Sequence, residues 1–209
     1  DCLLSRGLGD VYKRQTFRIG GPADFYLCPH STKEVQEIVE ICKEEKLPYF
    51  VLGNGSNLLV SDRGYRGVVI QLWKNFSDIT VKDCCIQAKA GALLSKVAAE
   101  ALEAGLTGME FASGIPGTIG GAAFMNAGAY GGEMKDIIKS VKVLDTQGEA
   151  RVLPKEELKM GYRTSIVKEK GYTVLSVELE LTRGNQEEIR NTMAVSYTHL
   201  RAHETRGNL

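Results

Sequence analysis

The residues best suited to hold a ligand lie in segment 111–133, FASGIPGTIGGAAFMNAGAYGGE. It contains seven glycines among small and apolar residues, one buried-type amide, Asn126, and no charge before Glu133. Glycine lets a backbone turn sharply and lets another body approach its peptide N–H groups closely. A solvent linker would favour polar residues instead. The segment therefore predicts a backbone surface shaped around a flat or anionic ligand. The alternative is a tightly packed glycine-rich corner of the core.

A second candidate ligand loop is segment 53–60, GNGSNLLV. Successive backbone N–H groups in such a turn form a concavity that binds anions. The loop is not a Walker motif, and it is not the dinucleotide fingerprint because Leu58 stands at the position of the third glycine. It is either a phosphate cradle or an ordinary tight turn. The apolar residues 58–60 predict a return to a strand.

The third candidate is Arg163, which follows Gly161 and Tyr162 in the segment MGYRTS. Arginine can hold a carboxylate through two parallel hydrogen bonds. A single exposed arginine is more commonly a surface residue that binds no ligand. The pattern alone does not decide between such a residue and a carboxylate-binding one.

Alternating short strands and helices are expected to position these segments. Residues 16–52 predict strand residues at Phe17 and Ile19, a strand at 23–27, a helix from a capping box at 31–34 to about Lys46, and a strand at 49–52. Farther along, we expect a strand at 67–72, a hairpin of 79–81 with 85–90, a helix over 93–102 that ends at Gly105, a hairpin of 141–145 with 150–153, and a strand over 173–181.

The composition limits the functions that the chain can have. It has 209 residues with 26 basic and 26 acidic side chains, so its zero net charge gives no electrostatic case for nucleic acid or a membrane surface. No apolar run approaches the roughly 20 residues that span a bilayer, and no signal peptide is evident. The five cysteines show no metal-ligand spacing, and adjacent Cys84 and Cys85 would point to opposite faces of a strand. We expect a reduced, cytoplasmic protein without a metal site.

The two ends of the chain lack any pattern. Residues 1–15 and 195–209 resemble translated adaptor sequence, so we exclude them from the fold prediction and attach no metal hypothesis to His199 or His203.

Read together, the motifs TFRIGGPAD, LGNGSNLLVSD, GMEFASGIPGTIGGAAFMNAGAYGGEM and GYRTSIVK resemble one family. It is the bacterial UDP-N-acetylenolpyruvoylglucosamine reductases, the UDP-N-acetylmuramate dehydrogenases of peptidoglycan synthesis. The resemblance covers about Thr16 to Ala194. It implies an α+β FAD-binding fold of the vanillyl-alcohol-oxidase type, with the flavin between two α+β subdomains at 16–72 and 73–194.

The resemblance also assigns roles to residues. It implies that the FAD pyrophosphate is bound by Gly53, Asn54, Gly55, Ser56 and Asn57. It implies that the other side of the cofactor is lined by Ser113, Gly114, Ile115, Pro116, Gly117, Gly120 and Gly121. Close, uncharged backbone donors are what a pyrophosphate needs, in agreement with the reading of the loops above.

Tyr162 and Arg163 correspond to the family's pair beside the substrate's enolpyruvyl group. In the family, NADPH reduces FAD, and the flavin passes hydride to the enolpyruvyl double bond of a UDP-sugar. Negative charge then develops next to the carboxylate, where the fixed cation of Arg163 would stabilise it as a catalytic residue. The family's further context is cell-wall biogenesis, cell shape and cell division.

One departure from the family concerns its third, substrate-binding domain, which carries a proton-donating serine and a late glutamate. Native-looking sequence stops near Ala194, and none of Ser56, Ser113 or Ser165 lies in the matching motif. We therefore expect an FAD-binding chain with little turnover. The alternatives are another FAD-dependent oxidase or dehydrogenase of this fold, and a non-catalytic flavin-binding module. The sequence gives no oligomeric state.

Overall fold

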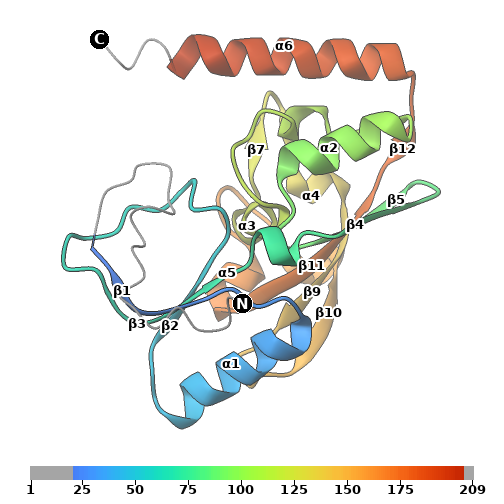
Figure 1. Ribbon diagram of the computed structural model, residues 1–209. Coiled ribbons are helices and arrows are strands. Elements are labelled where there is room, and N and C mark those ends of the chain that lie inside the picture. The colour runs from blue at the N-terminus through green and yellow to red at the C-terminus, as the bar shows by residue number, and fades with distance from the viewer. Residues whose placement is uncertain (1–20, 205–209) are drawn as a thin grey trace.

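The computed structural model describes residues 21–204, which form two main β-sheets and two short two-stranded ones, with helices packed around them (Figure 1). The predicted tail 1–15 and the predicted strand residues Phe17 and Ile19 lie outside the described residues. Part of the second predicted tail belongs to helix α6 (Gln186–Glu204), and residues 205–209 lie outside. The mixture of helices with separate sheets confirms the predicted α+β class.

The smaller sheet is parallel and has the order β1 (Ala23–Leu27), β3 (Tyr65–Gln71), β2 (Tyr49–Leu52). Helix α1 (Thr32–Glu44) connects β1 to β2. Its buried face joins the cluster that contains Ile70 of β3, and the predicted helix is confirmed.

The start of α1 differs slightly from the predicted capping box. Ser31 accepts the N–H of Glu34 at 3.2 Å, as expected, but the Glu34 carboxylate reaches the N–H of His30, one residue before the cap, at 3.0 Å. The helix start is confirmed, with the reciprocal bond shifted by one residue.

The larger sheet is antiparallel, with the order β10 (Ala150–Pro154), β9 (Ile138–Leu144), β11 (Thr173–Glu180), β5 (Cys85–Lys89), β4 (Ile79–Lys82). Both predicted hairpins are confirmed. The central strand β11 buries Leu175, Val177 and Leu179 almost completely, because alternate residues of a strand face the same side of a sheet.

Helices α2 (Leu94–Glu103) and α3 (Ile119–Met125) lie over this sheet. The predicted end of α2 is confirmed, since Gly105 has the left-handed φ of 64° that glycine adopts without a steric penalty. The remaining elements are short: η2 (Lys74–Phe76), β6 (Leu106–Thr107), η3 (Glu110–Ala112), β7 (Gly128–Ala129), β8 (Gly132–Glu133), α4 (Met134–Ile137), η4 (Lys155–Leu158), α5 (Ile166–Lys170) and β12 (Thr182–Arg183).

One local prediction was wrong. Residues 58–60 do not form a strand: Leu58 and Val60 pack on the small apolar cluster of the parallel sheet, but the segment pairs with neither of its outer strands, β1 and β2. Cys84 lies in the two-residue turn between β4 and β5, as the predicted hairpin of 79–81 with 85–90 implies, so it does not share a strand with Cys85. It is a free thiol, as are Cys28, Cys42 and Cys85.

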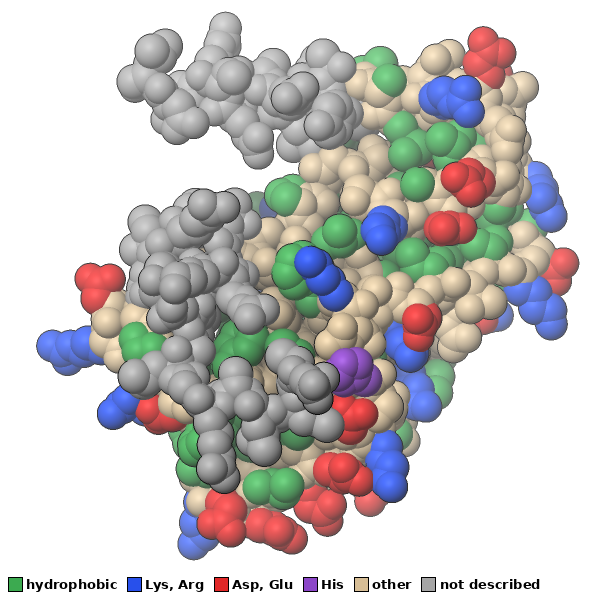
Figure 2. Space-filling model, viewed as in Figure 1, with side chains coloured by type: hydrophobic (Ala, Val, Ile, Leu, Met, Phe, Trp, Pro, Cys, Tyr) green, Lys and Arg blue, Asp and Glu red, His purple; other side chains and the backbone are tan. Residues whose placement is uncertain are grey.

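Charged side chains of both signs are spread over the visible face, and several acidic ones lie near one another along its lower edge (Figure 2). Among those residues, no helix has the length and apolarity that crossing a membrane requires.

Candidate functional site

The two predicted cofactor loops lie against each other. A Cβ placed on Gly53 would lie 2.5 Å from Oγ1 of Thr118, and one placed on Gly117 would lie 3.7 Å from Oγ of Ser56. Farther along both segments, the Asn57 Nδ2 group contacts Sδ of Met125 at 3.7 Å. The fold therefore brings together two segments that are far apart in the sequence.

The first loop begins where β2 ends and is held by a buried side chain. Gln71, on the neighbouring strand β3, donates its Nε2–H to the carbonyl of Gly53 at 3.1 Å. Only 4% of Gln71 is exposed, so this amide replaces water as the partner of the Gly53 carbonyl. Sequence reasoning missed Gln71, because the end of an apolar strand gives no sign of which way a single amide points.

The second loop is fixed between strand β5 and helix α2. Gly117 accepts the N–H of Leu94 at 3.0 Å, while Ile119 and Gly120 donate to the carbonyls of Ala92 and Ala90 at 2.8 and 2.9 Å. Thr118, 3% exposed, then begins α3 by accepting the N–H of Gly121. These bonds give the glycine-rich backbone one defined position.

The backbone N–H groups of the two loops fall into two classes. Within the described part of the chain, those of Asn54, Gly55, Ser56, Asn57, Gly114 and Gly117 donate no hydrogen bond. Those of Ser113, Ile115, Gly120 and Gly121 are already bonded inside the protein. The first class can therefore donate to a ligand, whereas the second class only sets how closely one can approach.

Gly120 and Gly121 are neighbours with different surroundings. A Cβ on Gly120 would lie 2.7 Å from Cβ of Ala90, so this glycine allows α3 to pack closely on β5. A Cβ on Gly121 would meet nothing nearer than Oγ1 of Thr118 at 3.6 Å, and Gly121 is exposed. Of these two neighbours, Gly121 is the one that leaves open space in front of the loop.

Tyr162 and Arg163 lie together beside a hollow of about 220 Å³. The hollow is also lined by Asn126 and by the hairpin formed by β7 and β8, residues 128–133. Both residues occupy the tip of a turn that is closed by the mutual backbone hydrogen bonds of Gly161 and Thr164, at 3.1 and 3.3 Å.

Two properties of Arg163 bear on ligand binding. Its φ is 54°, in the left-handed region that costs a non-glycine residue about 1–2 kcal/mol. Its guanidinium forms no ion pair or hydrogen bond with any of residues 21–204. Such strain concentrates at ligand-binding positions, and an unpaired guanidinium beside a hollow can bind a carboxylate.

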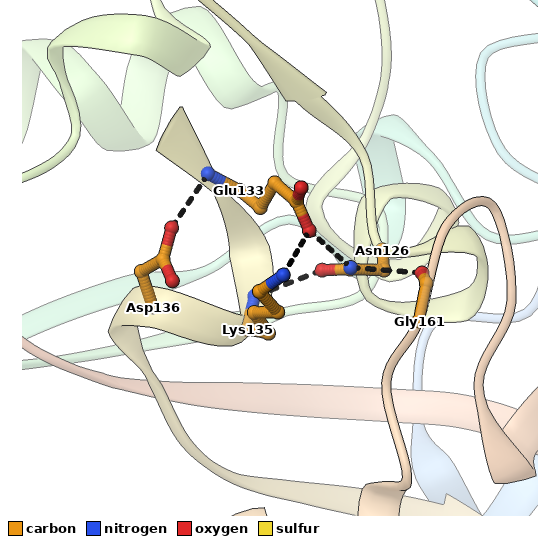
Figure 3. Close-up of polar contacts among 5 residues, drawn as sticks. All are labelled: Asn126, Glu133, Lys135, Asp136 and Gly161. Atoms are coloured by element: carbon orange, nitrogen blue, oxygen red, sulfur yellow. Dashed lines mark hydrogen bonds and ion pairs between the residues drawn. The ribbon is translucent and has the colours of Figure 1, made fainter. Parts of the chain in front are cut away.

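Helix α3 connects the cofactor loops to this pocket. It begins at Thr118, beside Gly53, and ends at Asn126, which lines the pocket and caps the helix with φ 47°. Its seven residues span about 10 Å. The Asn126 side chain is bonded to Glu133, Lys135 and Gly161 (Figure 3).

The carboxylate of Glu133 is the pocket's negative group. Its hydrogen bonds from Lys135 and Asn126, together with the charge of Lys135, hold the pKa of Glu133 below its ordinary value. Glu133 is therefore ionised at neutral pH. Sequence reasoning assigned no role to Asn126 or Glu133, although an amide within a glycine-rich segment was noticed.

Comparisons with known proteins agree with this geometry. The family of the FAD binding domain matches residues 23–153. The UDP-N-acetylenolpyruvoylglucosamine reductase of Alkaliphilus metalliredigens is 54% identical over 179 residues, which is 86% of this chain and 59% of that relative. The reductase of Clostridioides difficile is 49% identical, over 87% of this chain and 60% of that relative.

A solved structure is similar over nearly the whole chain. The crystal structure of UDP-N-acetylenolpyruvylglucosamine reductase from Thermus caldophilus aligns with a TM-score of 0.81 and 36% identity, over 96% of this chain and 70% of that one. The present chain thus spans about three-fifths of the length of the curated relatives cited above.

Proposed function

Because this chain belongs to the family of UDP-N-acetylenolpyruvoylglucosamine reductases, whose FAD-binding fold it has, we propose that it provides the flavin site of such a reductase. The reaction is the NADPH-dependent reduction of UDP-N-acetylglucosamine enolpyruvate to UDP-N-acetylmuramate, in cytoplasmic synthesis of the cell-wall precursor. The observation that carries the proposal is the juxtaposition of the two glycine-rich loops with a pocket that contains an unpaired arginine.

The residues present fit the FAD pyrophosphate. The N–H groups of Asn54, Gly55, Ser56 and Asn57 donate to no other described residue, and Gly55 has a φ of 76°, so successive amides can converge on an anion. Gly117 and Gly121 lack the side chains that would fill the space in front of the second loop. When bound, FAD would accept hydride from NADPH and pass it to the enolpyruvyl double bond.

The proposed substrate site is the pocket at the other end of α3. Arg163 would bind the enolpyruvyl carboxylate and stabilise the negative charge that develops beside it during reduction. Tyr162, whose surface is 89% exposed, can follow the ligand without losing protein contacts. Glu133 also lines the pocket, but its carboxylate is paired with Lys135 at 2.9 Å, so Arg163 is the unpaired charge that a ligand carboxylate would meet there.

We also propose that the two sheets mark the two subdomains. The parallel sheet falls within 16–72 and the antiparallel sheet within 73–194, and the cofactor loops come from one segment each. One buried cluster contains residues of both segments, for example Val35 and Ile86. This shared core would hold the two halves of the flavin site in a fixed relative position.

The test is the absorbance spectrum of purified protein after FAD has been added and excess removed. We expect flavin bands to remain with the protein and to shift when the enolpyruvyl UDP-sugar is titrated in. Retained flavin that responds to alcohols or sugar lactones instead would favour another oxidase or dehydrogenase of this fold. Flavin that responds to no substrate would favour a non-catalytic module, and loss of the bands would contradict all three.

A further inference from the structure

We propose that Asn126 is a positioning residue: its carboxamide holds the Gly161 carbonyl, and with it the turn that carries Arg163, at a fixed distance from the β7–β8 hairpin. The inference rests on the proposed function only for the identity of the ligand. Nothing in the sequence pattern assigned this amide a role.

The geometry of the amide is fully determined by its partners. Asn126 Nδ2 donates to Oε2 of Glu133 at 2.8 Å and to the carbonyl of Gly161 at 2.9 Å, while Oδ1 accepts the N–H of Lys135 at 2.9 Å (Figure 3). Exchanging the amide oxygen and nitrogen would place an oxygen against two acceptors, so only one orientation is compatible with these neighbours.

The two groups that receive the amide hydrogens belong to two segments that line the pocket. Glu133 ends the β7–β8 hairpin, and Gly161 precedes Tyr162 and Arg163 in their turn. Asn126 lies between them and is 3% exposed, so water does not compete for its hydrogens. One buried side chain therefore sets the separation of the two segments.

The bond to Glu133 is the stronger of the two. Glu133 also receives the Nζ of Lys135 at 2.9 Å, so its carboxylate is held in place and ionised. A hydrogen bond to an ionised group contributes more than a neutral one. The left-handed backbone at Asn126, with φ 47°, is a conformation that asparagine tolerates better than most residues.

Asn126 holds the N-terminal side of the Tyr162–Arg163 turn, which the contacts of Ser165 and Lys168 do not reach. On the C-terminal side of the turn, Ser165 bonds to Phe124 and Lys168 Nζ bonds to the Arg163 carbonyl. On the N-terminal side, Asn126 is the side chain among the described residues that bonds to Gly161. Losing its amide hydrogens should loosen this side without detaching α5.

The decisive variant is Asn126→Asp, which keeps the shape, the left-handed backbone and the acceptor for the Lys135 N–H. It removes both donors and places a carboxylate against Glu133 and the Gly161 carbonyl. Asn126→Gly is the second variant, because it removes the side chain and still allows a positive φ. The matched control is Asn185→Asp at the start of α6, where the side chain only accepts hydrogen bonds, from the N–H groups of Glu187 and Glu188.

Hydrogen exchange of the whole chain is the readout that needs neither cofactor nor ligand. The N–H groups of Gly161 and Thr164 are bonded across the turn, and we expect their exchange to accelerate about tenfold in both Asn126 variants, as one lost hydrogen bond predicts. The N–H of Tyr172, which follows α5 and donates to the carbonyl of Val167 within it, is the internal reference, and its exchange rate should not change. Asn185→Asp should leave all three as in the wild type.

The second readout is the affinity of FAD-loaded protein for the enolpyruvyl UDP-sugar, measured by the shift of the flavin bands. We expect the Asn126 variants to bind it about tenfold more weakly while retaining FAD as the wild type does. Unchanged exchange at Gly161 and Thr164 would overturn the inference, as would unchanged ligand affinity. General loss of protection and of FAD in both variants would also overturn it, because Asn126 would then support the fold rather than the pocket.

The two proposals can fail separately. If the wild type retains FAD but does not respond to the UDP-sugar, the proposed substrate is wrong, and the exchange of Gly161 and Thr164 alone decides the role of Asn126.

Discussion

Ser165 donates its hydroxyl hydrogen to the backbone carbonyl of Phe124 at 2.6 Å, which joins the start of α5 to the last turn of α3. Ser165 is completely buried, and the same hydroxyl accepts the N–H of Lys168 as the N-cap of α5. One side chain therefore satisfies a carbonyl of one helix and an amide of the next. This contact fixes the C-terminal end of the turn that carries Tyr162 and Arg163.

Ser165→Ala should destabilise the protein by about 1–3 kcal/mol, because it removes the hydroxyl that donates to the Phe124 carbonyl and also removes a helix cap. Urea unfolding measures the change. Ser31→Ala, which removes the N-cap of α1 at a partly exposed position, is the control. A Ser165→Ala effect no larger than that of Ser31→Ala would show that the Phe124 contact contributes little.

Gly121→Ala should separate the stability of the fold from retention of the cofactor. An alanine inside α3 meets no close neighbour, so the apoprotein should gain up to about 1 kcal/mol from helix propensity. The added methyl group would lie where the flavin nucleotide is proposed to bind, so FAD retention should fall. Thermal unfolding and flavin absorbance measure the two effects.

Gly120→Ala, at the adjacent position, should behave in the opposite way. Its Cβ would lie 2.7 Å from Cβ of Ala90, so the overpacked contact should cost about 1–3 kcal/mol of stability. Thermal unfolding of the apoprotein checks this. If the two variants were equally stable, the packing of α3 on β5 would differ from the one described.

Arg163→Gly should abolish binding of the enolpyruvyl ligand with little effect on stability. Glycine relieves about 1–2 kcal/mol of left-handed strain, and its greater freedom in the unfolded chain offsets about 0.5–1 kcal/mol of that gain. Lys46→Gly is the matched control, since Lys46 is also an exposed cation with a φ of 54°. Ligand titration and urea unfolding of both variants give the comparison. Retained ligand affinity in Arg163→Gly would exclude Arg163 as the carboxylate partner.

Acid should weaken the larger sheet through Glu178. Its carboxylate accepts hydrogen bonds from Lys139 and Ser140 at 2.9 Å each, and these bonds lower the pKa of Glu178 from 4.5. A carboxyl whose pKa is lower in the folded state stabilises the fold above its unfolded pKa, and this contribution disappears as the pH falls through the folded pKa.

Glu178→Gln should therefore lower stability at neutral pH and make the unfolding free energy fall less steeply below pH 4.5. Urea unfolding as a function of pH measures both. Glu180→Gln on the same strand is the control, because the Glu180 carboxylate forms no hydrogen bond within the described residues. Parallel pH curves for the wild type and Glu178→Gln would contradict the prediction.

The sequence predicted those features that depend on local pattern. Helix α1 follows from an apolar stripe behind Ser31, and strand β11 from strict alternation around Val177. Residues 58–60 show the limit of this reasoning, because an apolar run indicates burial but does not provide a strand with a partner. The resemblance to the reductases is confirmed by the relatives, whereas the individual site roles stay predictions.

The pocket could not be predicted in the same way. Asn126 bonds to residues 7, 9 and 35 positions away, and no spacing rule connects such partners. Gly120 and Gly121 are identical in the sequence, and only the position of Ala90 distinguishes the packed glycine from the open one. These distinctions depend on the tertiary fold, which brings distant backbone segments together.

The length of helix α3 also sets the distance between the cofactor loops and the pocket. Its first residue follows Thr118 at the loops, and its last precedes Asn126 at the pocket. One inserted residue would advance Asn126 by about 1.5 Å and rotate its side chain by about 100° about the helix axis, away from Gly161. This helix can therefore accept substitutions on its surface. An insertion or deletion within it would move Asn126 and the pocket out of their present position relative to the two loops.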